Sequence, residues 1–318
     1  MKLWGEARPE LAAYGKLPLS REFLLAGRET PLIRRFRDFL HAGAAHFETG
    51  HSAEGAEVRI CMPSSDGKRL LLSVTRASAD TGGLRSFPFS VFAVLDDAGR
   101  SRVHPGLCTV LGGLYSHLET SFQEARRQTD ANGFGHAFDG ESELEPPHPA
   151  KDADAEFADA AKSISLSDWS QSLIGDAERF KVLLWRVRRI VEGTQRDLSS
   201  LLPSKCGLRL PLAAGIPLEV QIDAWLSCFA DPKGRLGFAP HLVFGDVGPE
   251  NKPALAIFVR PLMPKDLTLS HATAPEDMLD LAVDKDPANM TGFDAFGATV
   301  SEALQNRHLG DLGALLQK

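Results

Sequence analysis

The chain has 318 residues, of which 43% are hydrophobic and 24% charged, and its formal net charge is −7. This balance excludes the disordered and collagen-like classes of protein and supplies enough apolar side chains for a sizeable core. No stretch approaches the roughly 18 apolar residues that a membrane helix needs, so direct membrane insertion is not expected. The N-terminus carries Glu6, Arg8 and Glu10 where a secretory leader is apolar, which predicts a cytoplasmic protein.

The negative charge is concentrated in one short segment. Residues 131–160 hold one basic and eight acidic residues, whereas residues 1–130 and 161–318 are nearly neutral. Without a basic face that could displace counterions from phosphates, nucleic-acid binding is not expected. The segment 131–162 is also rich in Gly, Pro and Ala, which predicts an acidic linker between a domain at 1–130 and another at 163–318. An acidic interaction segment for a basic partner is the alternative.

In the first domain the expected elements are a helix, three strands and a second helix. Thr30 and Pro31 provide an N-cap and a first helical position, and apolar residues at helical spacing continue to Phe47. Three apolar runs separated by turn sequences predict strands. The strands span residues 58–62, 70–75 and 87–95, and the second helix spans residues 107–122. This order predicts a mostly antiparallel sheet covered by helices.

The residues after the linker predict a second α/β domain. A long amphipathic helix is expected first, followed by a strand and a further helix, then two strands joined by a Gly/Pro/Asn loop, and two closing helices. These elements cover residues 180–191, 207–212, 222–229, 241–244, 254–259, 276–283 and 293–304.

The chain contains none of the common cofactor or nucleophile signatures, namely GxxxxGK[ST], HExxH, GxSxG and GxGxxG. His41, His46 and His51 are five residues apart, which turns each about 140° on a helix and prevents them from sharing one metal. The four cysteines lie far apart in apolar stretches and predict reduced core thiols. The residues alone therefore predict no cofactor, no metal site and no catalytic residue.

Two stretches of the first domain are unusual. Residues 14–24 read YGKLPLSREFL, and CMPSSDG at 61–67 is followed, after an insertion, by LRSFPFS at 84–90. Together they resemble the TagF (ImpM) family of type VI secretion accessory proteins, which open with a GKLPxRGDF-like element and later show an MPSxDxxGRxFP element. Residues 19–22 replace the family's Ser-Arg-Gly-Asp, and the resemblance is best over residues 12–130.

The resemblance implies a three-layer α/β/α sandwich for the N-terminal domain. It also implies a non-enzymatic protein that represses type VI secretion after translation, by binding and sequestering a forkhead-associated scaffold protein of the threonine-phosphorylation pathway. The partner-binding residues would come from the two motifs: Lys16, Leu17, Pro18, Arg21, Phe23, Arg85, Phe87 and Pro88. The oligomeric state is left open.

Both motifs also have a purely structural interpretation. Gly15 to Pro18 can form a turn after a first strand, with Phe23 and Leu24 entering the core and Lys16 in solvent. Arg85 with Phe87 and Pro88 can begin an edge strand. Two other functional classes also stay open. The first is a phosphate-ester hydrolase that uses Asp66, Arg85 and a histidine, and the second is a structural component of the secretion assembly.

Overall fold

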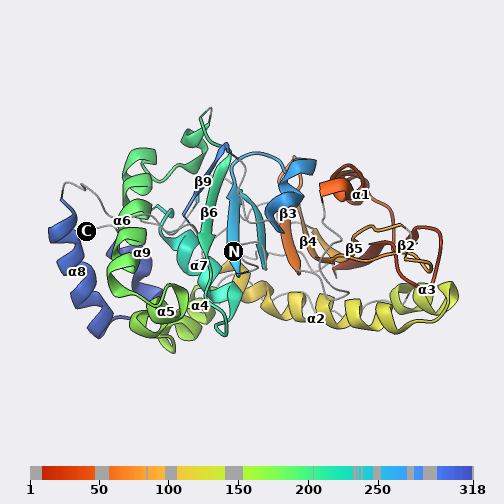
Figure 1. Cartoon of the computed structure of the whole chain (residues 1–318), viewed down its shortest axis with the longest axis horizontal. Helices are drawn as coiled ribbons and strands as arrows, with labels where there is room; N and C mark the ends of the chain where they lie inside the picture. The colour runs from red at the N-terminus through yellow and green to blue at the C-terminus, as the bar shows by residue number, and fades with distance from the viewer. Residues whose placement is uncertain are drawn as a thin grey trace.

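One β-sheet spans most of the molecule, and helices extend beyond one of its ends (Figure 1). The computed structural model describes residues 9–46, 57–83, 85–96, 106–139, 153–202, 204–231, 234, 236–237, 239–245, 252–270, 276–281 and 292–316. Within them, nine strands lie in the order β2-β1-β5-β4-β3-β7-β8-β6-β9. The strands are β1 (Glu10–Gly15), β2 (Leu24–Ala26), β3 (Val58–Pro63), β4 (Arg69–Arg76), β5 (Phe89–Asp96), β6 (Gly207–Pro211), β7 (His241–Gly245), β8 (Ala254–Phe258) and β9 (Met278–Asp280).

Strands from both parts of the chain pair directly. β3 is antiparallel to β7, with Val58 opposite Gly245 and Cys61 opposite Leu242. The other described pairs are also antiparallel except β6 with β9, which run parallel. The expected α/β fold with a mostly antiparallel sheet is therefore confirmed, and both sides of the predicted linker contribute strands to the sheet.

Helices cover both faces of this sheet because successive side chains of each strand point to opposite faces. In β1, Ala12 and Tyr14 join one buried cluster while Ala13 joins the other. The helix α1 (Pro31–Gly43), the turn η1 (Ala44–His46) and the 3-10 segment η5 (Pro264–Ser270) lie on the first face. The long helix α2 (Leu107–Arg127) crosses the opposite face, below the strands in Figure 1.

The remaining helices pack on the α2 side of the sheet, mostly towards the C-terminal end of the molecule (Figure 1). They are α3 (Ala131–Asp139), α4 (Ala153–Lys162), α5 (Leu166–Leu173), α6 (Ala177–Thr194), η3 (Leu198–Leu201), α7 (Leu218–Ser227), α8 (Phe293–Asn306), η6 (Leu309–Asp311) and α9 (Leu312–Leu315). Trp169 and Trp225 are fully buried among them, and Gln221 accepts a hydrogen bond of 2.9 Å from the Trp169 indole. The Trp225 indole donates a hydrogen bond of 3.0 Å to the Pro211 carbonyl, so both buried tryptophans have hydrogen-bond partners.

A carboxylate of α7 caps the N-terminus of helix α2. Its own N-cap, Gly106, has φ +101° and no side chain. The fully buried Asp223 instead accepts hydrogen bonds from the backbone N–H groups of Cys108 (3.0 Å) and Thr109 (2.6 Å), and from the Thr109 hydroxyl (2.7 Å). These donors belong to the first turn, where no intrahelical partner exists, so Asp223 serves as a cap from a distant part of the chain.

Most of the predicted elements are found. Thr30 caps α1 as expected, since its hydroxyl accepts a hydrogen bond of 3.3 Å from the Ile33 N–H. The predicted helix at 276–283 is wrong, because Met278–Asp280 forms β9 beside β6. The segment has too few apolar residues to distinguish the 3.6-residue period of a helix from the two-residue period of a strand, and its pairing with β6 makes it a strand.

The segment predicted as a linker carries a helix at each end. Residues 131–139 form α3 and residues 153–162 form α4, while residues 140–152 lie outside the described residues. Phe134 and Phe138 of α3 and Phe157 of α4 are buried in the core. The weak periodicity did not indicate these helices, and the division into two domains stays a prediction.

Candidate partner-binding surface

The first motif stretch lies beside residues 85–90 of the second at one end of the sheet, whereas residues 61–67 lie at the other end of β4. β1 ends at Gly15, whose φ is +139° and whose missing Cβ would come within 2.2 Å of the Pro88 carbonyl oxygen. Only glycine permits this close approach. Beyond it, the Ser20 carbonyl accepts a hydrogen bond of 3.3 Å from the Thr81 N–H. The loop between β1 and β2 therefore rests on the connection between β4 and β5.

An aromatic ring is presented at this junction. Phe23 is 39% exposed, and its ring stacks on Tyr14 with centroids 5.7 Å apart and planes 8° apart. The same ring packs edge-on against Phe87 at 4.7 Å and lies 4.8 Å from His41. Tyr14 and Phe87 are buried, and the Tyr14 hydroxyl hydrogen-bonds to His41 Nε2. Phe23 thus has one face against buried rings and a part of its surface in solvent.

Lys16 holds both the loop that carries Phe23 and the Phe23 ring. The expectation that Lys16 is solvated is wrong, because the residue is only 2% exposed and Nζ donates a hydrogen bond of 2.6 Å to the Arg21 carbonyl. The same ammonium lies 4.6 Å from the centroid of the Phe23 ring, within the range of a cation–π contact. Lys16 therefore fixes both the loop backbone and the exposed ring.

The eight motif residues named from the sequence divide by burial. Lys16, Leu17, Phe87 and Pro88 are buried, whereas Pro18, Arg21, Phe23 and Arg85 are exposed. The exposed four can reach another molecule, and the buried four hold them in place. We call Pro18, Arg21, Phe23 and Arg85 the motif surface.

Arg85 is anchored loosely by a buried carboxylate. Its Nε lies 3.7 Å from Oδ2 of Asp80, while its side chain is 63% exposed. Asp80 also accepts a hydrogen bond of 3.3 Å from the Arg85 N–H, and its carbonyl accepts one of 2.9 Å from Gly83. Asp80 therefore shapes the loop and leaves much of the guanidinium facing outward.

Asp66, the acid considered for a hydrolase, lies in a different place. It occupies the turn between β3 and β4, where its carboxylate accepts hydrogen bonds from the Ser64 hydroxyl (2.6 Å) and the Lys68 N–H (3.0 Å). The Ser64 bond in particular lowers the pKa of Asp66. Arg85 follows the other end of β4, a strand of eight residues or roughly 26 Å, so Asp66 and Arg85 do not share a site.

Sequence reasoning missed three residues of this region. Leu25 of β2 is 45% exposed and follows Phe23 at the two-residue spacing that places both side chains on one face. Tyr14 and His41 are 27 residues apart and meet only because α1 packs over β1. In the sequence, an exposed edge strand was indicated only by two apolar residues two positions apart, Phe23 and Leu25, close to a glycine.

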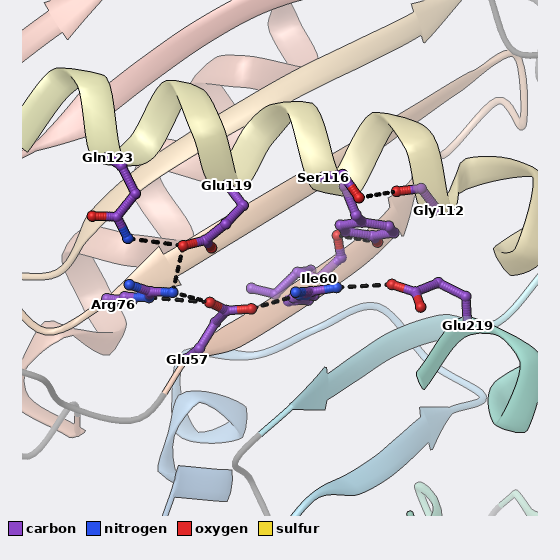
Figure 2. Close-up of polar contacts among 10 residues, drawn as sticks. Glu57, Ile60, Arg76, Gly112, Ser116, Glu119, Gln123 and Glu219 are labelled. Atoms are coloured by element: carbon purple, nitrogen blue, oxygen red, sulfur yellow. Dashed lines mark hydrogen bonds and ion pairs between the residues drawn. The ribbon is translucent and has the colours of Figure 1, made fainter. Parts of the chain in front are cut away.

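A second polar cluster joins β3, β4, α2 and α7 (Figure 2). Arg59 bridges two carboxylates, donating to Glu57 at 2.6 Å and to Glu219 of α7 at 2.8 Å. Arg76 bonds to Glu57 and, at 2.6 Å, to Glu119, which points down from α2 in Figure 2. The cluster ties β3 to helices on both sides of the predicted linker.

The carboxylates of this cluster have shifted pKa values. Burial, together with the neighbouring Glu57, raises the pKa of Glu119. Burial opposes ionisation of Glu57 as well, but hydrogen bonds with Glu119, Arg59 and Arg76 outweigh it and lower the pKa of Glu57. Because each arginine has carboxylate partners inside the protein, we interpret the cluster as structural.

Two general searches complete the description. In the part of the chain that the structure describes, no three His, Cys, Asp or Glu side chains are grouped to hold a metal ion. No helix in the same part has the length and apolar character to cross a bilayer.

Comparisons with known proteins find weak likeness to solved structures. No family model matches the chain, and no curated protein matches it. Among solved structures, the crystal structure of PA0076 from Pseudomonas aeruginosa PAO1 matches with 21% sequence identity and a TM-score of 0.32. The match covers 44% of this chain and 64% of that one, so less than two thirds of the known structure is matched. A likeness of this strength carries no conclusion about function.

Proposed function

We propose that the chain is a non-enzymatic, TagF-like negative regulator of type VI secretion. In this proposal it acts after translation by binding and sequestering a forkhead-associated scaffold protein of the threonine-phosphorylation pathway. The contact is made by the motif surface. The supporting observation is that residues 14–24 and 85–90, which carry the resemblance and are far apart in the sequence, adjoin at Gly15 and Pro88 and share the Phe23–Phe87 contact.

The physical character of the motif surface supports protein recognition. Binding energy in interfaces is concentrated in a few aromatic and arginine side chains that lie on ordered surroundings. Phe23 is already held by Tyr14 and Phe87, so little conformational entropy is lost when a partner covers it. Arg21 and Arg85 are exposed, and arginine side chains can pair with carboxylates of a partner.

The test is affinity purification of the tagged chain from its native host, with mass spectrometry of the bound proteins. We expect wild type to recover the scaffold and the Phe23→Ala variant to recover it at least about tenfold less, as for a central interface residue. Leu202→Ala is the matched control, because Leu202 is similarly exposed at 44% and lies outside the motifs. Lys16 is avoided because its replacement would disturb the loop that holds Phe23.

The regulatory part of the proposal is tested by an in-frame deletion in the same host. Secretion through the type VI apparatus should rise when the chain is absent and return to normal when it is restored. Unchanged or lower secretion after deletion would count against repression. Recovery of assembly proteins in fixed stoichiometry would indicate a structural component, and turnover of a phosphothreonine peptide would indicate an enzyme.

A further inference from the structure

A small cavity lies at the C-terminal end of α6, a helix at the other end of the molecule from β2 (Figure 1). Its volume is about 220 Å³. Pockets for drug-sized ligands measure roughly 300–1,000 Å³, so this one suits a small molecule or a single side chain of a larger one. The described residues that line it come from α6, the turn after α6 and the end of α9: Arg188, Val191, Glu192, Gln195, Arg196 and Leu316.

The two arginines of the cavity have unused N–H groups. Arg188 donates through Nε to Glu192 at 2.8 Å, and its guanidinium lies 5.1 Å from the centre of the Phe296 ring. Its Nη groups make no hydrogen bond with any residue that the structure describes. Arg196 makes one long hydrogen bond, of 3.4 Å, from Nη1 to the Ala230 carbonyl. Both guanidinium groups can therefore donate hydrogen bonds to a ligand.

The charge around the cavity is positive, although one of its walls is a carboxylate. Glu192 is bound by Arg188 and also by Arg189, whose Nη1 lies 2.9 Å from the second carboxylate oxygen. Together with Arg196, three guanidinium groups surround one carboxylate. Only 23% of the Arg188 side chain is exposed, so water screens its charge incompletely. The excess of positive charge favours an anionic ligand.

The turn that lines the cavity has a strained backbone. Gln195 and Arg196 have φ values of 49° and 66°, and they are the two residues other than glycine with positive φ in the described part of the chain. Their N–H groups donate to the carbonyls of Glu192 (3.3 Å) and Val191 (3.1 Å), which is the helix ending that glycine favours. Side chains are thus present where glycine would be less strained, and both of them line the cavity. Strain of this kind is typical of functional sites.

The number of donors favours a phosphate group over a carboxylate. One planar guanidinium is enough to bind both oxygens of a carboxylate. A phosphate monoester offers three acceptor oxygens and carries a charge of about −1.5 to −2 at neutral pH. Arg188, Arg196 and the amide of Gln195 supply donors from three side chains. Val191 and Leu316 are buried and form an apolar wall for the carbon atoms next to the phosphate.

We propose that this cavity binds a phosphate monoester, held by the guanidinium groups of Arg188 and Arg196 and by the side-chain amide of Gln195. The same chemical group occurs in small phosphorylated metabolites and in phosphorylated side chains of other proteins, and suitable probes separate these two sources. The site does not involve the motif surface, so it stands independently of the proposed function.

The test is isothermal titration calorimetry of the full chain at about 0.15 M salt. The probes are inorganic phosphate, glycerol 3-phosphate and a short peptide that contains phosphothreonine, and glycerol and the unphosphorylated peptide are the controls. We expect the phosphorylated probes to bind and the controls not to bind. Binding of the phosphopeptide about tenfold more tightly than glycerol 3-phosphate would assign a protein as the source, and similar or weaker binding would assign a metabolite.

Arginine variants test the residues of the site. Arg188→Met and Arg196→Met should each weaken phosphate binding at least about tenfold, because each removes charge-assisted hydrogen bonds. Arg189→Met is the matched control, since Arg189 bonds to the same Glu192 but does not line the cavity, and it should weaken binding less than about threefold. Circular dichroism and thermal unfolding check that each variant is folded.

A glycine variant tests the strained turn with two readouts. Gln195→Gly should raise the thermal unfolding midpoint because it removes strain, and should weaken phosphate binding because it removes the amide. A purely structural turn would gain stability without any change in affinity, which would overturn the assignment of Gln195. The whole proposal is overturned if no phosphorylated probe binds, if the Arg188 and Arg196 variants bind like wild type, or if Arg189→Met loses as much affinity as they do.

Discussion

Replacing Asp223 with asparagine should change how the stability of the protein depends on pH. Burial raises the pKa of Asp223 to about 6 from 3.8, although hydrogen bonds from Thr109 and Cys108 oppose the shift. The folded protein therefore keeps this proton at pH values where the unfolded chain has released it. The resulting stabilisation is complete below about pH 4 and is lost as the pH rises through about 6.

The size of the effect follows from the shift. One pKa unit corresponds to about 1.4 kcal/mol, so the shift amounts to about 3 kcal/mol, of which about 2 kcal/mol is lost between pH 4 and 7.5. Asparagine carries no charge, and its one side-chain oxygen can accept the two Thr109 hydrogen bonds; its NH2 group cannot accept the bond from Cys108, but that loss does not depend on pH. The Asp223→Asn variant should therefore gain about 2 kcal/mol relative to wild type over this interval.

Urea unfolding monitored by tryptophan fluorescence at both pH values measures this difference, since Trp225 is buried in the same helix. Asp176 provides a control of opposite sign, because hydrogen bonds from Arg179 and Glu178 lower the pKa of this exposed N-cap. Its contribution is present at neutral pH and is lost on acidification. A stability difference between wild type and Asp223→Asn that does not change with pH would refute the reasoning.

Three further predictions concern buried groups. Arg209→Met should destabilise the protein by about 3 kcal/mol in urea unfolding, because the fully buried Arg209 pairs with Asp280; a loss below about 1 kcal/mol would contradict this. Burial raises the pKa of Cys61 to about 12, so iodoacetamide at pH 8 should leave Cys61 unmodified until urea is added. Mass spectrometry measures this, and modification of Cys61 in the native protein would contradict the prediction. Lys16→Met keeps the aliphatic stem but removes the donor to the Arg21 carbonyl, and should cost about 1 kcal/mol; an unchanged unfolding midpoint would contradict the supporting role of Lys16.

The elements with strong local determinants could be predicted from the sequence. α1 follows from Thr30, Pro31 and the apolar spacing after them, and the strands β3 and β4 follow from long apolar runs between turn residues. Short elements were not determined in this way. β2 and β9 have three residues each, and their pairing with β1 and β6 makes them strands.

The candidate surface, too, could be predicted from the sequence only in part. The motif residues could be named from the sequence, but their burial could not. A lysine is seldom buried, and nothing local indicates that the Arg21 carbonyl and the Phe23 ring would satisfy Lys16. The contact between Ser20 and Thr81 depends on β1 pairing with β5, which is remote in sequence.

The pairing of β3 with β7 has a consequence for synthesis on the ribosome. β3 leaves the ribosome early and pairs with β4, but its other edge gains a partner only when His241–Gly245 has been made. During that interval the growing chain exposes an apolar edge in the middle of the future sheet, a state that favours aggregation and chaperone binding. The rate of elongation through the second part of the chain thus decides how long the nascent protein needs protection.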